Sequence, residues 1–116
     1  MANISVDGVV VGGQGARETA TTASTLSAYL TSEITSTAAQ AYILPAPIAG
    51  LLKTIIKTSS STAVQTASAT LGGTTSTIGL AGVTLTFTLN DQSITLLGLS
   101  GTKWQVISNV GSVTVS

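Results

Sequence analysis

The sequence predicts an all-β protein: a single β-sandwich, or a jelly-roll-like barrel, with an extended N-terminal arm. Two observations predict this class. Short runs of β-branched and apolar residues follow one another from residue 51 onward, and Gly, Asn, Asp or Ser bounds each run. The chain has 116 residues, the length of one domain, which is enough to bury a core without disulfides or metals. No repeat of fixed period indicates a solenoid.

Residues 1–24 are predicted to form the arm, and residues 25–116 the β-sandwich domain. The arm contains a short apolar run at residues 9–11, which a glycine-rich break at residues 12–15 ends. The rest of the arm is polar and rich in Thr and Ala. We expect a neighbouring molecule to order such a terminal segment.

The charged residues of the arm are candidates for contact with a partner. They are Asp7, Arg17 and Glu18. In a chain with few charges, these three residues can fix the register of the arm on a partner through contacts at the rim of an interface. The alternative is that they only keep the arm solvated.

Residues 25–45 fit two different patterns. A helix starting at Ser24 or Thr25 would place apolar side chains on one face, namely Leu26, Tyr29, Leu30 and Ile34. The alternative is two strands, at about residues 26–31 and 34–44. The frequent Thr and Ile residues favour the strands.

Two prolines and a glycine at residues 44–50 predict a rigid, extended corner. Residues 51–58 follow as a strand with two different faces. Lys53 and Lys57 share one face with Ile55, and we expect this to be a half-buried or edge face along which lysine side chains reach solvent.

The remaining strands are expected at residues 63–70, 76–80, 83–89, 93–98, 103–108 and 112–115. Strict alternation in the run 83–89 directs Val83, Leu85, Phe87 and Leu89 inward. Phe87 and Trp104 are the predicted anchors of the core. The alternative for Trp104, a platform for stacking on carbohydrate, is less favoured because aromatic residues are only 3% of the chain.

The composition argues against an enzyme. The chain has no histidine and no cysteine, and 7% of its residues are charged, against about 25% in an average domain. A Ser-His-Asp triad is therefore excluded, a Ser–Lys dyad has no distinguished serine, and the acidic residues are scattered singly. Asn90 and Asp91 form a turn signal more simply than a calcium site. We expect no catalytic residue, no metal and no cofactor.

Charge also limits the partners. The formal net charge is zero, which argues against nucleic acid and against an anionic membrane surface. No run of about 18 apolar residues occurs, and the N-terminus lacks the features of a signal peptide. The absence of cysteine makes the fold independent of redox state, which suits synthesis in the cytoplasm. A surface with so few charges favours a homo-oligomer or a place in a larger assembly.

The C-terminal two-thirds carries an ordered set of motifs: YILPAP at residues 42–47 with Gly-Leu at 50–51, ITLL at 94–97, GTKWQVIS at 101–108 and GSV at 111–113. This set, within residues 36–115, resembles small β-sandwich modules of tailed-bacteriophage virion proteins. Such modules occur as head decoration (cement) proteins and in tail fibres.

The resemblance implies a homotrimer that binds the major capsid protein and stabilises the outer surface of a phage head. The protein would then be made in the host cytoplasm and be found on the capsid of the virion. The short chain favours decoration over a fibre. The alternative is a tail-fibre or spike module that binds a host receptor or glycan.

Overall fold

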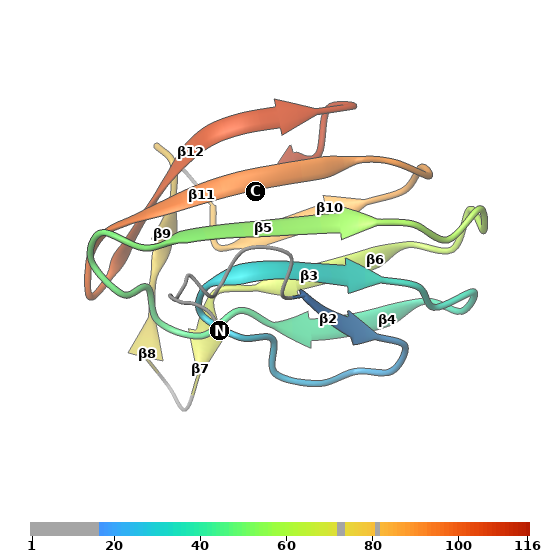
Figure 1. Cartoon of the computed structure of the whole chain (residues 1–116), viewed down its shortest axis with the longest axis horizontal. Helices are drawn as coiled ribbons and strands as arrows, with labels where there is room; N and C mark the ends of the chain where they lie inside the picture. The colour runs from blue at the N-terminus through green and yellow to red at the C-terminus, as the bar shows by residue number, and fades with distance from the viewer. Residues whose placement is uncertain (1–16, 72–73, 81) are drawn as a thin grey trace, which may run out of the picture.

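The computed structural model describes residues 17–71, 74–80 and 82–116, and these residues form an all-β structure without helices (Figure 1). A six-stranded sheet has the order β2-β3-β5-β11-β12-β9, a four-stranded sheet has the order β13-β10-β6-β4, and β7 pairs with β8. The strands are β2 (Arg17–Ala20), β3 (Leu30–Ile34), β4 (Gln40–Ile43), β5 (Leu52–Lys57), β6 (Gln65–Ser68), β7 (Thr70–Leu71), β8 (Thr74–Thr75), β9 (Thr77–Ile78), β10 (Thr84–Phe87), β11 (Ser93–Ser100), β12 (Lys103–Val110) and β13 (Thr114–Val115).

The all-β class predicted from the sequence is thus confirmed. Within residues 25–45 the strand interpretation is correct, and the helix is wrong. Strand β3 lies a few residues later than the first predicted strand, and β4 is shorter than the second, because the chain between β3 and β4 crosses from one sheet to the other.

The first half of the described chain winds like a β-solenoid. Strands β3, β4, β5 and β6 alternate between the two sheets. Pairing is parallel between β2 and β3, between β3 and β5, and between β4 and β6. The sequence did not reveal this winding, because successive coils differ in length: the paired positions Arg17, Thr31 and Thr54 are unevenly spaced along the chain.

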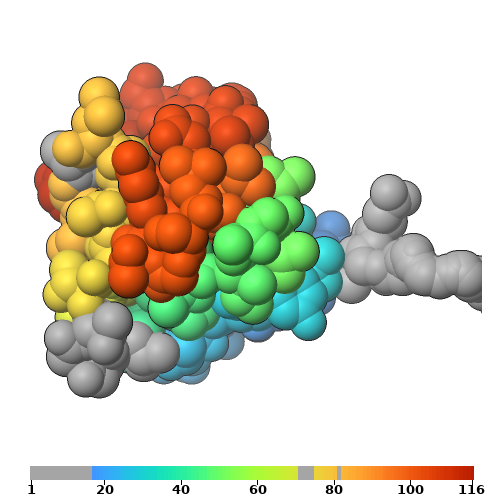
Figure 2. Space-filling model, turned by 90° about the vertical axis from the view of Figure 1, so that its left-hand side faces the viewer, coloured from blue at the N-terminus to red at the C-terminus, as the bar shows by residue number. Residues whose placement is uncertain are grey.

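The second half is mainly antiparallel. Strand β11 pairs with both β5 and β12, and β10 pairs with both β6 and β13. Strand β9 departs from this pattern, because it lies parallel to β12. In Figure 2, the segment around β9 (yellow-orange) lies beside the β11–β12 hairpin (orange to red).

One core lies between the inner faces of the two sheets. Alternate residues of β5, β6, β10 and β11 are buried, as a sheet with one buried face requires. The core consists of Ala20, Leu26, Ile34, Tyr42, Leu44, Ile55, Ala67, Ala69, Ile78, Leu85, Phe87, Ile94, Leu96, Trp104 and Val113.

The predicted alternation fails at one end of β10. Leu89 is exposed rather than inward. The reason is Gln92, whose Oε1 accepts the backbone N–H of Thr88 at 2.6 Å and that of Leu89 at 2.8 Å. These bonds turn the chain away from the sheet before Leu89 can reach the core.

The proline-rich corner at residues 44–50 packs directly on β11. The N–H of Gly50 donates to the carbonyl of Gly98 at 2.8 Å, and the N–H of Gly98 donates to the carbonyl of Leu51 at 2.9 Å. A Cβ atom on Gly98 would lie 2.2 Å from the carbonyl oxygen of Ile48. This close approach of two backbones requires glycine at position 98.

Candidate functional site

The predicted arm residues have different locations. Asp7 lies outside the described residues. Arg17 and Glu18 belong to β2, which pairs in parallel with β3 at one edge of the six-stranded sheet. The prediction of a free arm is therefore wrong for residues 17–20, which form a strand. Arg17 pairs with Glu33 on the neighbouring strand, with Nη1 3.0 Å from Oε2.

Glu18 and Lys53 belong to a polar network that surrounds the buried Lys53 ammonium. The Lys53 side chain is fully buried, and its Nζ donates to Ser27 Oγ at 2.9 Å and to Ser32 Oγ. The same Nζ lies 3.6 Å from Glu18 Oε1. That carboxylate oxygen also accepts the backbone N–H of Ser27 at 2.7 Å and the hydroxyl of Ser32. The network ties β2, β3 and the loop between them to β5.

Burial and hydrogen bonding shift the pKa values of both charged groups in this network. Burial lowers the pKa of Lys53 to about 8, an effect that the charge of Glu18 and its hydrogen bond partly offset. Burial alone would raise the pKa of Glu18, but hydrogen bonds from Ser32 and Ser27 and the charge of Lys53 lower it. At pH 7 Lys53 is therefore mostly an ammonium, which donates hydrogen bonds to the hydroxyls of Ser27 and Ser32.

Lys57 is the second buried lysine. Its Nζ donates to the carbonyl of Ser59 at 2.7 Å and to the carbonyl of Ser61, and burial lowers its pKa. The predicted half-buried or edge location of the two lysines is wrong. Both share the inner face of β5 with the core residue Ile55, and both have an exposed fraction of 0%.

The stability of the protein is expected to rise with pH above neutrality. Unfolded Lys53, with its ordinary pKa of 10.5, binds a proton that the folded lysine releases above about pH 8. The free energy of unfolding should increase by about 1–2 kcal/mol between about pH 7 and 9.5. Urea titrations at several pH values in this range measure the slope.

Lys53→Met removes the titrating group and is the matched variant for the pH dependence of the free energy of unfolding. Lys57 contributes a change of the same sign, so the variant should flatten the pH dependence without removing it. Keeping below pH 10 avoids the opposite contribution of Tyr42, whose pKa burial raises. Equal slopes in the two proteins would contradict the assignment to Lys53.

The outer side of β12 forms an open edge. Strand β12 pairs with β11 from Lys103 to Val110, but on its other side β9 reaches only Lys103 and Trp104. Among the described residues, no strand pairs with this side of residues 105–110, which we call the open edge. Ile107 and Val110 on the open edge are more than half exposed.

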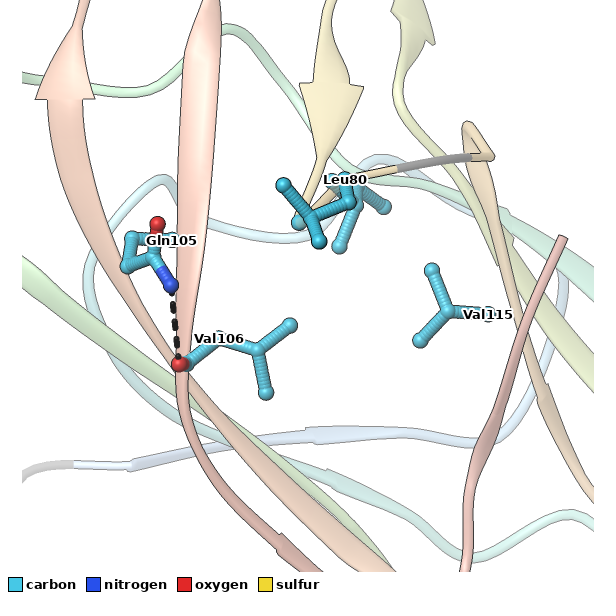
Figure 3. Close-up of a pocket in the computed structure, with 6 residues that line it drawn as sticks. Leu80, Gln105, Val106 and Val115 are labelled. Atoms are coloured by element: carbon cyan, nitrogen blue, oxygen red, sulfur yellow. Dashed lines mark hydrogen bonds between the residues drawn. The ribbon is translucent and has the colours of Figure 1, made fainter.

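A groove adjoins the open edge. It has a volume of about 290 Å³ and lies between β12 and the ends of β9 and β13, lined by Ile78, Gly79, Leu80, Gln105, Val106 and Val115. Leu80, Val106 and Val115 face the same space in Figure 3. The polar end of Gln105 is turned to the carbonyl of Val106, with Nε2 3.4 Å from that oxygen. A lining with so few polar groups suits aliphatic side chains better than a polar ligand.

The rest of the surface has little charge. Two of the four cationic residues are buried, and Arg17 and Glu33 neutralise each other. Large apolar side chains are exposed instead, among them Leu52, Leu80, Leu89, Leu99, Ile107 and Val110. Leu80, fully exposed beside the groove, is the extreme case. Exposed apolar surface next to an open strand edge is typical of a site that another chain covers.

The predicted core anchors Phe87 and Trp104 are both fully buried. Trp104 therefore presents no ring face to a sugar, and the carbohydrate-stacking alternative for this residue is wrong. In the described part of the chain, no three His, Cys, Asp or Glu side chains come together as metal ligands. No helix of these residues is long and apolar enough to span a membrane.

The open edge and the groove were not among the predicted site residues. Alternation from Trp104 places Ile107 on the outer face of its strand, but a strand edge has no composition of its own that would mark it in the sequence. Comparison with known proteins adds no assignment: no family model and no curated protein matches this sequence.

Proposed function

We propose that this protein is a non-enzymatic virion protein, a decoration (cement) protein that binds the outer surface of a bacteriophage head. In this proposal the two sheets are the layers of a β-sandwich, and three copies associate as a homotrimer. The partners are other copies of the chain and the major capsid protein. The chain is made in the host cytoplasm and reaches the capsid surface of the virion.

The observation that carries the proposal is the open edge of β12 beside an apolar groove. An unpaired strand edge and exposed aliphatic side chains are liabilities for an isolated protein, and natural proteins normally cover them. Here Leu80 has no burial at all, and Ile107 is 54% exposed. In a structural protein, contacts with other copies and with a shell would cover both the open edge and the exposed aliphatic side chains.

The buried charges also support a structural role. Lys53 and Lys57 have their ammonium groups engaged by neighbouring chain segments. No reactive group of these lysines is therefore presented to solvent. Both lysines instead fix loops to the edge of the core, which suits a part that must keep its shape.

Two measurements test the proposal. Sedimentation of the purified protein should give three times the 11.5 kDa mass of the chain at micromolar concentration. Shells assembled from the major capsid protein of the same phage should bind the protein saturably in a gradient, whereas shells of an unrelated phage should not. Binding to host cells instead of shells would favour the tail-fibre alternative, and binding to neither would contradict both.

A further inference from the structure

We propose that the groove and the open edge of β12 bind the N-terminal segment, residues 4–11, of a second copy of this chain, as an added strand. This inference rests on the homo-oligomer of the proposed function. It goes further by naming the segment that joins one copy to the next and the surface that receives it.

The receiving surface suits an extended peptide. Strand addition needs a run of backbone that no strand pairs and pockets for alternate side chains. Residues 105–110 provide the first, and the space between Leu80, Val106 and Val115 provides the second. The groove lies directly beside the open edge, because Gln105 and Val106 belong to both.

The N-terminal segment has the matching composition. Ile4, Val6 and the three valines at 9–11 supply β-branched aliphatic side chains, which favour a strand. Asp7 is the only charged residue in the first sixteen. Lys103, at the start of β12, takes part in neither of the ion pairs that the described residues form, so it is available as a counter-charge.

The position of β2 favours exchange between copies. The described chain begins at Arg17 in β2, which lies at the opposite edge of the six-stranded sheet from β12 and β9. Three strands separate β2 from β12, a distance of about 19 Å across the sheet. The seven residues from Val10 to Arg17 span at most about 25 Å. To reach its own groove, the segment would have to cross a sheet face in an extended conformation.

A head-to-tail arrangement shortens this path. If the β2 edge of one copy lies beside the β12 edge of the next, the segment passes directly to the neighbouring groove. Such a contact joins two different surfaces, and it closes into a ring when the rotation between copies permits. A ring of three copies would leave no open β12 edge.

Disulfide trapping tests the exchange, because the chain has no cysteine of its own. One full-length variant carries Val10→Cys, and a second, with a size tag, carries Leu80→Cys. Leu80 is fully exposed, so its replacement leaves the core intact. The two proteins are mixed, allowed to exchange subunits and oxidised. We expect a cross-linked band that contains one tagged and one untagged chain.

Leu89→Cys is the matched control, an exposed leucine outside the groove that should give no such band. The double variant with both Val10→Cys and Leu80→Cys tests whether the segment binds the groove of its own chain. An internal disulfide in a single chain, with no mixed cross-link, would overturn the exchange. Sedimentation of the same samples distinguishes failure of the segment exchange from failure of the proposed homo-oligomer. A trimer without the cross-link overturns only the exchange, whereas a monomer overturns the homo-oligomer as well.

A charge in the groove should weaken association without unfolding the protein. Leu80→Asp is expected to raise the dissociation constant of the oligomer at least tenfold. Val10→Asp, which places the charge on the inserted segment instead of the groove, should have the same effect. Leu89→Asp should leave the constant unchanged. Equal effects of the changes at positions 80 and 89 would contradict the proposed binding surface, because they would trace the loss to added charge alone.

Discussion

Trp104→Ala is expected to lower the free energy of unfolding by about 3–5 kcal/mol, the range for removing a buried aromatic side chain. The Trp104 side chain is fully buried on the inner face of β12 and belongs to the core that both sheets share. Its removal would leave a cavity between the sheets that their hydrogen-bonded strands cannot close. Because a domain of this size is stable by only about 5–15 kcal/mol, urea denaturation should show a large fall in the midpoint.

Trp104→Phe separates packing from hydrogen bonding at this position. The indole Nε1 is buried and has no hydrogen-bond partner among the described residues. Phenylalanine keeps much of the aromatic volume and removes this unsatisfied donor, so we expect less than half the loss caused by alanine. Equal losses would contradict this account and would indicate that the indole N–H has a partner.

Local alternation predicted much of the C-terminal half. In β10 the pattern correctly buries Leu85 and Phe87, and in β12 it buries Trp104. Each prediction needed only that successive side chains point to opposite faces of a strand. The pattern failed at Leu89, where the side-chain amide of Gln92, just before β11, turns the chain first.

The faces of β5 could not be assigned from the sequence. Ile55 lies between two lysines, while Ile56 lies on the opposite face between two threonines, so each face carries one isoleucine. Preference for exposed lysine selects the wrong face. In the structure both lysines pass beside the core and reach polar groups beyond it, Ser27 Oγ and Ser32 Oγ for Lys53 and two carbonyls for Lys57. Only the tertiary structure brings these acceptors within reach.

The parallel winding and the open edge are also properties of tertiary structure. Parallel pairing joins β3 to β5 and β4 to β6 across intervening strands, so no local signal marks it. The open edge exists because β9 is short and pairs with only two residues of β12. A sequence pattern shows that residues 103–108 form a strand, but it does not show how far a neighbouring strand extends.

Gly98→Ala is expected to destabilise the protein by about 3 kcal/mol, the upper range for overpacking a tight contact. The new Cβ would lie 2.2 Å from the Ile48 carbonyl oxygen and 2.8 Å from its carbonyl carbon. These are backbone atoms of the proline-rich corner, so no side-chain rotation can relieve the contact. Moving the corner would strain both hydrogen bonds that join it to β11, which run from Gly50 to Gly98 and from Gly98 to Leu51.

Gly101→Ala is the matched control, because it makes the same chemical change three residues later, in the turn between β11 and β12. An added Cβ at Gly101 meets no atom within 4 Å, and its φ is not in the left-handed region. Its thermal midpoint should stay within about 2 °C of the wild type, while that of Gly98→Ala falls by more than about 8 °C. A small effect at position 98 would mean that the corner moves freely on β11. Equal falls in the thermal midpoint at both positions would contradict the role of the close backbone contact. They would indicate that the hairpin prefers glycine in general.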